Sequence, residues 1–398
     1  MGVYHNKKNR IPLIHNGFQP MFESSPRTID LRDKMPRLIY APLFAVVALL
    51  SGCADFQGPL APAAAATPAK PAMTMAPAVP VVTAMPAPPT TEPLGIAMEG
   101  WAYPYPVQTM QFKQNGRILR MAYMDVQPTR ANGQTVLLLH GKNFGSDYWA
   151  QTLRTLSERG YRVIAPDQIG FGKSSKPEAR YTFEQLVSNT TLLLDTLKVG
   201  RTAVVANSMG GMLGVHFANR HPERVTALVL EDPLGLEDYR QSIPPQNTAN
   251  LVKLEMAQTP ESYRRFLKGY FPNWKPEYER LVEQFARVQQ SAEYPRFAHV
   301  SALTYQMIYE GPIFGELPKL KVPTLLVIGQ LDRTVFGRRF APPEVVKPLG
   351  DFPVLGKAAQ KAIPGAKLVE FEGVGHVPHL EVPERFNTVV LEFLSDKR

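Results

Sequence analysis

From residue 135 onward, short apolar runs alternate with longer segments of helical periodicity. We expect strands over residues 135–139, 161–165, 202–206, 227–230, 324–328 and 367–371. Helices are expected over residues 146–159, 183–197, 209–219 and 383–394. Strands that are apolar throughout are typical of parallel sheets covered on both faces. The alternation therefore predicts an α/β fold with a mostly parallel, doubly wound sheet.

Two further segments extend this body. Residues 107–112 and 118–126 flank Asn115-Gly116, which predicts a hairpin ahead of the alternating region. Residues 236–315 carry helical periodicity without strand-like runs, so we expect a helical cap inserted between the core segments 101–235 and 316–398. Its conspicuous apolar side chains are Leu251, Leu254, Tyr263, Phe266, Tyr270, Phe271, Trp274, Tyr278, Phe285 and Tyr305. We expect most of these aromatic residues to be ordinary core, and a minority to line a pocket between cap and sheet.

The N-terminal part of the chain has the sequence pattern of a targeting segment. Residues 38–50 form an apolar run that is shorter than the ~20 residues of a membrane span but suits the hydrophobic region of a signal peptide. The run ends in Leu-Ser-Gly-Cys, which resembles the bacterial lipobox. This resemblance implies that residues 1–52 are an extension and signal peptide, with Met35 as a possible start. It makes Cys53 the lipidated first residue of the mature protein; the alternative is a buried free thiol.

The same resemblance implies a location. The residue after the cysteine is Ala54 instead of Asp, which resembles outer-membrane sorting. We therefore expect a lipid-anchored protein of the bacterial cell envelope, held at the outer membrane and facing the periplasm. Residues 53–100 are rich in Pro and Ala, so we expect a semi-stiff tether between that membrane and the folded body.

Composition excludes several classes of partner and site. The chain has 44 Lys and Arg against 35 Asp and Glu, but no basic run stands out after residue 52, which argues against a nucleic-acid partner. With one cysteine, no intramolecular disulfide and no cysteine-based metal site can form. We expect neither a cofactor nor a metal, and the sequence does not predict the oligomeric state.

The sharpest motif is Ala-Asn-Ser-Met-Gly-Gly at residues 206–211, between an expected strand and an expected helix. In that context it matches the nucleophile elbow G-x-S-x-G, with Ala206 in place of the first glycine. Ser208 would then be a nucleophile exposed on a tight turn at the carboxyl edge of the sheet. The competing interpretation is that Ser208 caps the following helix.

A serine nucleophile needs a base, and the base needs an acid that fixes its tautomer. His376 lies in the loop between the expected strand 367–371 and the last helix, and His379 is the competing base. Asp332 follows the strand 324–328 and is the expected acid, with Asp232 as the alternative. His140 ends its own strand, where we expect it to order the turn.

The order Ser…Asp…His, with His140-Gly141-Lys142 upstream, resembles the α/β-hydrolase superfamily over about residues 105–398. The resemblance implies an α/β-hydrolase fold in which the backbone N–H groups of Lys142 and Met209 form an oxyanion hole. The Lys142 ammonium then lies either at the pocket mouth, where it would favour anionic substrates, or in solvent.

These motifs predict a Ser-His-Asp hydrolase that cleaves a carboxylic ester of a small or medium organic substrate through an acyl-enzyme. The first alternative is a carbon–carbon bond hydrolase, because Asn-Ser-Met-Gly-Gly and Gly-Phe-Gly-Lys-Ser resemble the ring-cleavage-product hydrolases. Against it, the longer Gly/Pro-rich oxyanion loop of those enzymes is absent, and Val377 stands where they carry an aromatic residue. A non-catalytic receptor is a further alternative, whereas epoxide hydrolases and dehalogenases need Asp at position 208.

Overall fold

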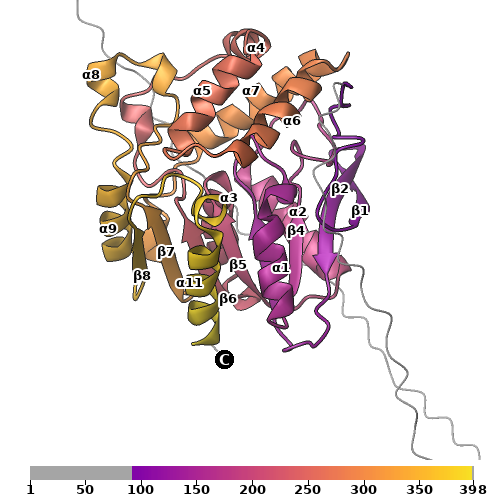
Figure 1. Cartoon of the computed structure of the whole chain (residues 1–398), viewed down its shortest axis with the longest axis vertical. Coiled ribbons are helices and arrows are strands. Elements are labelled where there is room, and N and C mark those ends of the chain that lie inside the picture. The colour runs from indigo at the N-terminus through magenta and orange to yellow at the C-terminus, as the bar shows by residue number, and fades with distance from the viewer. Residues whose placement is uncertain (1–91, 397–398) are drawn as a thin grey trace, which may run out of the picture. The chain divides into compact units, whose positions relative to one another are not determined.

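The computed structural model describes residues 92–396. Eight strands form one sheet in the order β1-β2-β4-β3-β5-β6-β7-β8 (Figure 1). The strands are β1 Val107–Gln114, β2 Arg117–Val126, β3 Thr135–Leu139, β4 Arg162–Pro166, β5 Thr202–Asn207, β6 Val225–Glu231, β7 Thr324–Gly329 and β8 Lys367–Phe371. β2 is antiparallel to both of its neighbours, and all other neighbouring strands are parallel. The expected mostly parallel sheet and its leading hairpin are confirmed.

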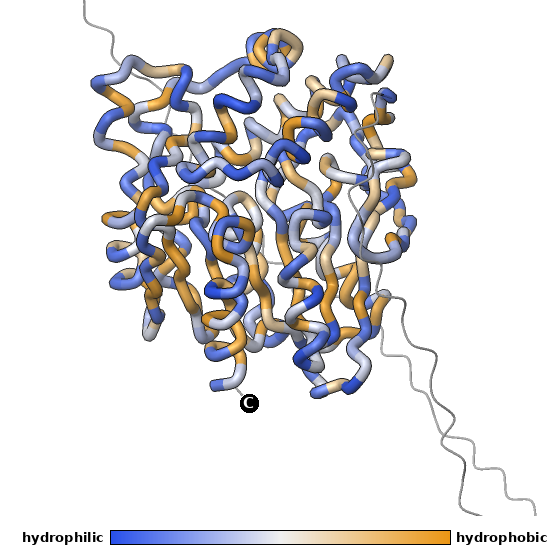
Figure 2. Tube along the Cα trace, in the orientation of Figure 1, coloured by the Kyte–Doolittle hydropathy of each residue, from blue (hydrophilic) through white to orange (hydrophobic). Residues whose placement is uncertain are grey.

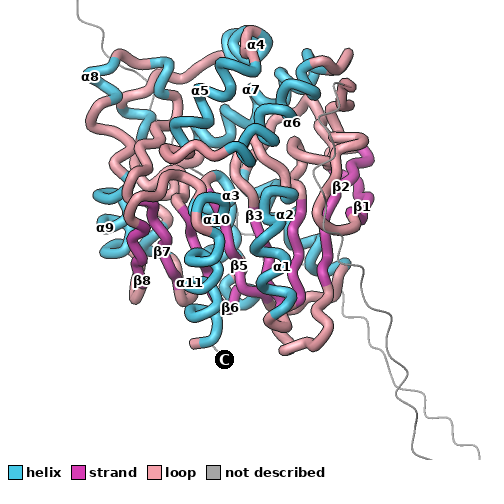
Figure 3. The backbone as a smooth tube through the Cα atoms, in the orientation of Figure 1, coloured by secondary structure: helices cyan, strands magenta, loops and turns pink. Residues whose placement is uncertain are grey.

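Helices cover both faces of the sheet (Figure 3). They are α1 Ala150–Glu158, α2 Phe183–Thr196, α3 Met209–Arg220, α4 Thr248–Met256, α5 Pro260–Tyr270, α6 Glu279–Gln289, α7 Tyr294–Glu310, α8 Pro343–Val346, α9 Phe352–Ala362, α10 Pro378–Glu381 and α11 Pro383–Ser395. Apolar side chains of α1 and α11 form one core with the sheet, and those of α2, α3 and α9 form the core on the other face. Figure 2 shows the hydrophobic stretches following the strands through the middle of the body.

The central strands are apolar because no side of them meets water. Every residue of β5 is buried, and so is every residue of β7. Close packing at the head of α3 requires a glycine, since a Cβ on Gly210 would lie 2.2 Å from the backbone oxygen of Leu139. This approach brings the start of α3 against the end of β3, where the candidate site lies.

Helices α4 to α7 lie together over the carboxyl ends of the strands, at the top of Figure 1. They occupy the segment in which we expected a helical insertion. Capping side chains define their starts: Asn247 accepts from the backbone of Asn250 ahead of α4, and Thr259 forms a capping box with Ser262 ahead of α5. Within residues 92–396, no helix combines the length and the hydropathy that a membrane crossing requires.

Two local expectations differ from the structure. The expected helix 146–159 begins as a 3₁₀ turn over Ser146–Trp149 before α1. Helix α9 was not expected, although Phe352, Ala359 and Ile363 have helical spacing and are buried. The alanines and the glycine between them weaken the apolar pattern, which explains why periodicity alone misses this helix.

The N-terminal predictions lie largely outside the described residues. These are the extension and signal peptide of residues 1–52, the lipidated Cys53 and the tether up to residue 91. Residues 92–100, assigned to the tether, are instead packed on the body. Leu94, Ile96 and Met98 are buried, and the Leu94 N–H donates to the carbonyl of Arg287 in α6 at 3.0 Å. Every second side chain from Leu94 to Met98 packs against apolar side chains of α6 and the sheet. The segment is therefore part of the folded body and does not act as a spacer.

Candidate active site

Ser208 occupies a strained turn between β5 and α3. Its backbone has φ 56° and ψ −119°, a conformation that non-glycine residues rarely adopt and that the surrounding structure must enforce. The Ser208 N–H donates to the Glu231 carbonyl at 3.0 Å, and the Ser208 carbonyl accepts from Gly211 and Leu234. These bonds tie the turn to β6 and α3, so the hydroxyl is held at the edge of the sheet.

The side chains of Ser208, His376 and Asp332 lie within hydrogen-bond distance of one another in that order. His376 Nε2 lies 2.9 Å from Ser208 Oγ, and its Nδ1 lies 2.6 Å from Asp332 Oδ2. An ionised carboxylate can only accept, so Nδ1 carries the proton and Nε2 is free to accept from the hydroxyl. All three residues are at most 5% exposed. The three predicted residues are therefore brought together in the order that the sequence motifs suggested.

Asp232, the alternative acid, does not contact His376. Its carboxylate oxygens accept from the Gly329 N–H at 3.0 and 3.2 Å. Burial, together with the nearby carboxylates of Asp332 and Glu231, raises the pKa of Asp232 well above its ordinary value. Asp232 therefore fastens the end of β7 and leaves the acid position to Asp332.

The competing histidines have other partners. His379 Nδ1 lies 2.8 Å from Glu231 Oε2, and its ring stacks on Trp149 with centroids 3.8 Å apart. His140 Nε2 accepts from the Gln168 N–H at 3.0 Å, and burial lowers the pKa of this ring. A neutral His140 thus joins β3 to the loop after β4, as expected for a residue that orders its turn.

The expected oxyanion donors lie beside the serine. A Cβ on Gly141 would be 3.1 Å from Ser208 Cβ, which places the Gly141–Lys142 peptide next to the nucleophile turn. Within residues 92–396, neither the Lys142 N–H nor the Met209 N–H has a hydrogen-bond acceptor. Two unpaired N–H groups at this point are the arrangement that an oxyanion would complete.

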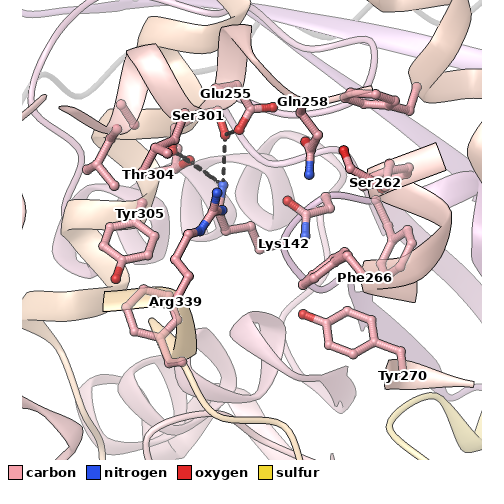
Figure 4. A pocket seen from close by; sticks show the side chains of 18 of the residues that line it. Lys142, Glu255, Gln258, Ser262, Phe266, Tyr270, Ser301, Thr304, Tyr305 and Arg339 are labelled. Atoms are coloured by element: carbon pink, nitrogen blue, oxygen red, sulfur yellow. Dashed lines mark hydrogen bonds between the residues drawn. The ribbon is translucent and has the colours of Figure 1, made fainter. Parts of the chain in front are cut away.

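A cavity of about 720 Å³ opens between the cap and the sheet (Figure 4). Its lining includes Lys142 and Tyr270, whose ring lies 4.5 Å from that of His376, but not Ser208, Asp332 or His376 themselves. The cap aromatics that line the cavity are more than the expected minority, although three of them, Tyr263, Phe285 and Tyr305, are also buried members of the hydrophobic core. Five of the eight line the cavity, namely Tyr263, Phe266, Tyr270, Phe285 and Tyr305. Helical periodicity shows that a side chain faces inward, but it cannot show whether the interior there is packed or hollow.

Similarity to known proteins identifies the family of the chain. A family model described as the alpha/beta hydrolase fold matches residues 134–383. The chain belongs to the α/β-hydrolase fold family. It is 31% identical over 287 residues, covering 71% of this chain and 93% of the relative, to a 2-hydroxy-6-oxononadienedioate/2-hydroxy-6-oxononatrienedioate hydrolase of Burkholderia vietnamiensis. It is 28% identical over 274 residues, covering 67% and 89%, to a 2-hydroxy-6-oxo-6-phenylhexa-2,4-dienoate hydrolase of Comamonas testosteroni.

Solved structures give the same family. A crystal structure of a probable hydrolytic enzyme from Pseudomonas aeruginosa is 43% identical, with a TM-score of 0.75, covering 76% of this chain and 98% of that one. A structure of a membrane phospholipase A is 27% identical, with a TM-score of 0.55, covering 73% and 87%.

In this α/β hydrolase, supporting residues that the sequence analysis did not single out hold the site together. Asn207 Nδ2 donates to the His376 carbonyl at 3.1 Å, and Asn207 Oδ1 accepts from Tyr148 Oη at 3.2 Å. Tyr148 Oη in turn accepts from the Gly141 N–H at 2.8 Å. Glu381 Oε1 accepts from the Gly375 N–H at 2.9 Å. Adjacency to Ser208 was the available signal for Asn207, whereas nothing in the sequence pairs Tyr148 or Glu381 with the site.

No metal centre is evident in this part of the chain. Across residues 92–396, no three His, Cys, Asp or Glu side chains converge in a way that could hold an ion. The side chains aligned at the described site are the Ser208 hydroxyl, the His376 imidazole and the Asp332 carboxylate.

Proposed function

We propose that this α/β hydrolase is a serine hydrolase that cleaves the carbon–carbon bond beside the 6-oxo group of a 2-hydroxy-6-oxo-dienoate. The observation that carries the proposal is the unbroken line Ser208 Oγ–His376 Nε2, His376 Nδ1–Asp332 Oδ2 at 2.9 and 2.6 Å. The relatives named as hydrolases of such acids, at 28–31% identity over most of their length, support this choice of substrate class.

In the proposed reaction His376 acts first as a base, then as an acid and then as a base again. His376 accepts the Ser208 proton while Oγ bonds to the 6-oxo carbon, and the charge that develops on the carbonyl oxygen is met by the N–H groups of Lys142 and Met209. The bond breaks from the 2-oxo tautomer of the substrate, in which the proton of the 2-hydroxyl group has moved to the carbon beside the 6-oxo group. Collapse breaks the bond to that carbon and delocalises its electron pair onto the 2-oxo oxygen, which takes the proton from His376. Water, deprotonated by His376, then hydrolyses the acyl-enzyme and releases a carboxylic acid.

The cavity supports a substrate of this type. Its volume of about 720 Å³ lies within the range of small-molecule sites, ~300–1,000 Å³. Aromatic and aliphatic side chains from α4, α5, α6 and α7 line it together with polar and charged side chains. Such a cavity suits a conjugated acid that has an apolar end and an anionic end.

A second candidate function is hydrolysis of a carboxylic ester. It is supported by the 27% identity to a membrane phospholipase A and by Val377, since the position after the histidine lacks the aromatic residue of the ring-cleavage-product hydrolases. The same line of side chains would perform this reaction, with an alkoxide in place of the carbanion as leaving group.

The two candidates are separated by offering the full chain both substrates. We expect loss of the absorbance of 2-hydroxy-6-oxo-6-phenylhexa-2,4-dienoate with one benzoate released per molecule consumed, and slower hydrolysis of p-nitrophenyl butyrate. Fast ester hydrolysis with no benzoate would favour the second candidate.

A covalent test addresses the nucleophile in either case. An aryl or alkyl phosphonate should add one adduct, located on Ser208 by peptide mass spectrometry. Ser208→Ala should lose both the adduct and turnover, whereas Ser188→Ala on α2, outside the cavity lining, should retain them. Unchanged turnover in Ser208→Ala would rule out the proposed chemistry.

A further inference from the structure

The Lys142 side chain leaves the sheet edge and enters the cavity. Its Nζ donates to Ser301 Oγ at 3.1 Å, to the Ser301 carbonyl at 3.3 Å and to Thr304 Oγ1 at 3.3 Å, all on α7 (Figure 4). The half-buried lysine thus spans from the nucleophile turn to the cap. It does not extend into solvent, which was one of the two expectations for it.

These partners fix the ammonium without neutralising it. All three acceptors are uncharged, and within residues 92–396 Lys142 forms no ion pair. The nearest acid on this wall, Glu255, is held one step away, because Ser301 Oγ donates to Glu255 Oε2 at 3.1 Å. A charged donor held by neutral oxygens keeps its attraction for an incoming anion.

The cavity lining as a whole carries a net positive charge. Its lining includes the cations Lys142, Arg333, Arg338 and Arg339 against a single acid, Glu255. Figure 4 shows the Arg339 side chain directed toward Lys142. Arg339 forms no ion pair among the described residues either, so two cations face one region of the cavity, and the only acid in the lining, Glu255, contacts Lys142 through Ser301.

We infer that the Lys142 ammonium, positioned by Ser301 and Thr304, binds a carboxylate of the substrate, which takes the place of one of these neutral acceptors. Arg339 adds attraction at the cavity mouth. The backbone of Lys142 lies beside Ser208 and its ammonium lies at α7. The length of the side chain therefore sets the distance between the reacting carbonyl group and the bound carboxylate of a substrate. The side chain spans as many bonds from Cα to Nζ as separate the 6-oxo carbon from the C1 carboxyl of the proposed dienoates. Only this match of lengths rests on the proposed function; the contacts and charges that support the subsite do not.

Binding to an inactive protein tests the subsite without requiring turnover. The full chain carrying Ser208→Ala is titrated calorimetrically with 4-phenylbutyrate and with its neutral amide, 4-phenylbutyramide. We expect the acid to bind about tenfold or more tightly than the amide, as a charge-assisted hydrogen bond allows. Adding Lys142→Met should bring the two dissociation constants within about threefold of each other. Equal binding of acid and amide before that change would overturn the subsite.

Two further variants keep the result interpretable. Lys253→Met removes the same charge from α4 at an exposed position outside the cavity lining, and the preference for the acid should remain. Lys142→Arg preserves the charge and should keep part of the preference, which covers the case in which Lys142→Met fails to fold. A preference that survives both Lys142 substitutions at full size would also overturn the subsite.

The result is independent of the proposed bond cleavage. If the dienoate is not hydrolysed but the acid preference collapses in Lys142→Met, the subsite stands and the proposed function fails. If the dienoate is hydrolysed while the preference is unaffected, the function stands and the subsite fails.

Discussion

The side chain of Asn207 donates to the backbone carbonyl of His376 at 3.1 Å, so the residue before the nucleophile holds the loop that carries the base. The same amide group faces the Glu231 carbonyl, and its oxygen accepts from Tyr148. One buried amide therefore connects the nucleophile turn, the histidine loop and, through Tyr148, the N–H of Gly141. Asn207 acts as a positioning residue, since it lies behind the reacting groups.

Removing the donor alone should disturb this alignment. We expect Asn207→Asp to lower kcat by up to about a hundredfold with little change in KM, because a small displacement of the base is costly while the cavity is untouched. Asn219→Asp is the matched control, since Asn219 Nδ2 makes the same kind of bond, to the Glu316 carbonyl at 3.0 Å, on the far end of α3. An equal loss in both variants would indicate a general effect on folding and would contradict the positioning role.

The roles of the two aspartates can be separated by isosteric changes. Asp332→Asn should lower kcat by as much as ~10⁴-fold, because an amide favours the wrong imidazole tautomer. Asp232→Asn should lower kcat far less, since asparagine still accepts from Gly329 and the pKa of Asp232 is already raised well above its ordinary value. Steady-state kinetics of the two variants decide the assignment, and a larger loss in Asp232→Asn would reverse it.

The raised pKa of Glu381 should make the stability of the protein depend on pH. Burial raises the pKa of Glu381 to about 7 from its ordinary 4.5, against the lowering by the N–H groups of Gly375 and Val377; Asp332 adds to the rise and His376 opposes it. A group whose pKa is raised on folding contributes stability at low pH that is lost as pH rises through the folded pKa. Wild type should therefore lose stability relative to Glu381→Gln between about pH 4.5 and 7.

Thermal melting of both proteins at matched pH values measures this difference. Glu384→Gln, an exposed carboxylate on α11, should show no comparable trend. A constant difference in Tm between wild type and Glu381→Gln from pH 4.5 to 8 would contradict the raised pKa.

The sequence predicted the fold and the three aligned residues because both depend on local patterns. Ser208 and Asp332 each follow a fully buried strand, and His376 follows β8, whose residues are mostly half-buried, so parallel topology delivers all three to one edge. The supporting contacts could not be predicted, since Asn207 meets His376 across 169 positions and Lys142 meets Ser301 across 159. Such pairs depend on the docking of the cap and loops, which no periodicity encodes.

We propose that Cys53 anchors the chain to an envelope membrane, a prediction that rests on the apolar run and Leu-Ser-Gly-Cys, since this residue lies outside the described part of the structure. Cys53→Ser should abolish incorporation of labelled fatty acid and shift the protein from the membrane to the soluble fraction. Stable anchoring requires more than one acyl chain. Unchanged fractionation of Cys53→Ser would contradict the anchor, and Ser51→Thr, which leaves the cysteine in place, should remain in the membrane.

The ionisation of Lys142 predicts how carboxylate binding depends on pH. Burial lowers the pKa of Lys142 to about 8; Glu255 on α4 opposes this shift, Arg339 after β7 adds to it, and the facing α7 side chains Ser301 and Thr304 are uncharged. Below pH 8 the ammonium attracts an anion, and above it the charge is progressively lost, so the affinity of Ser208→Ala for 4-phenylbutyrate should fall as pH rises from about 8 to 10. Binding of the neutral amide should not follow this trend. Lys142→Arg should remove the trend as well, because a guanidinium stays charged throughout this range. Calorimetric titrations at intervals across this range measure both ligands, and an acid affinity that is flat in the lysine protein, or that falls equally in Lys142→Arg, would show that another group binds the carboxylate.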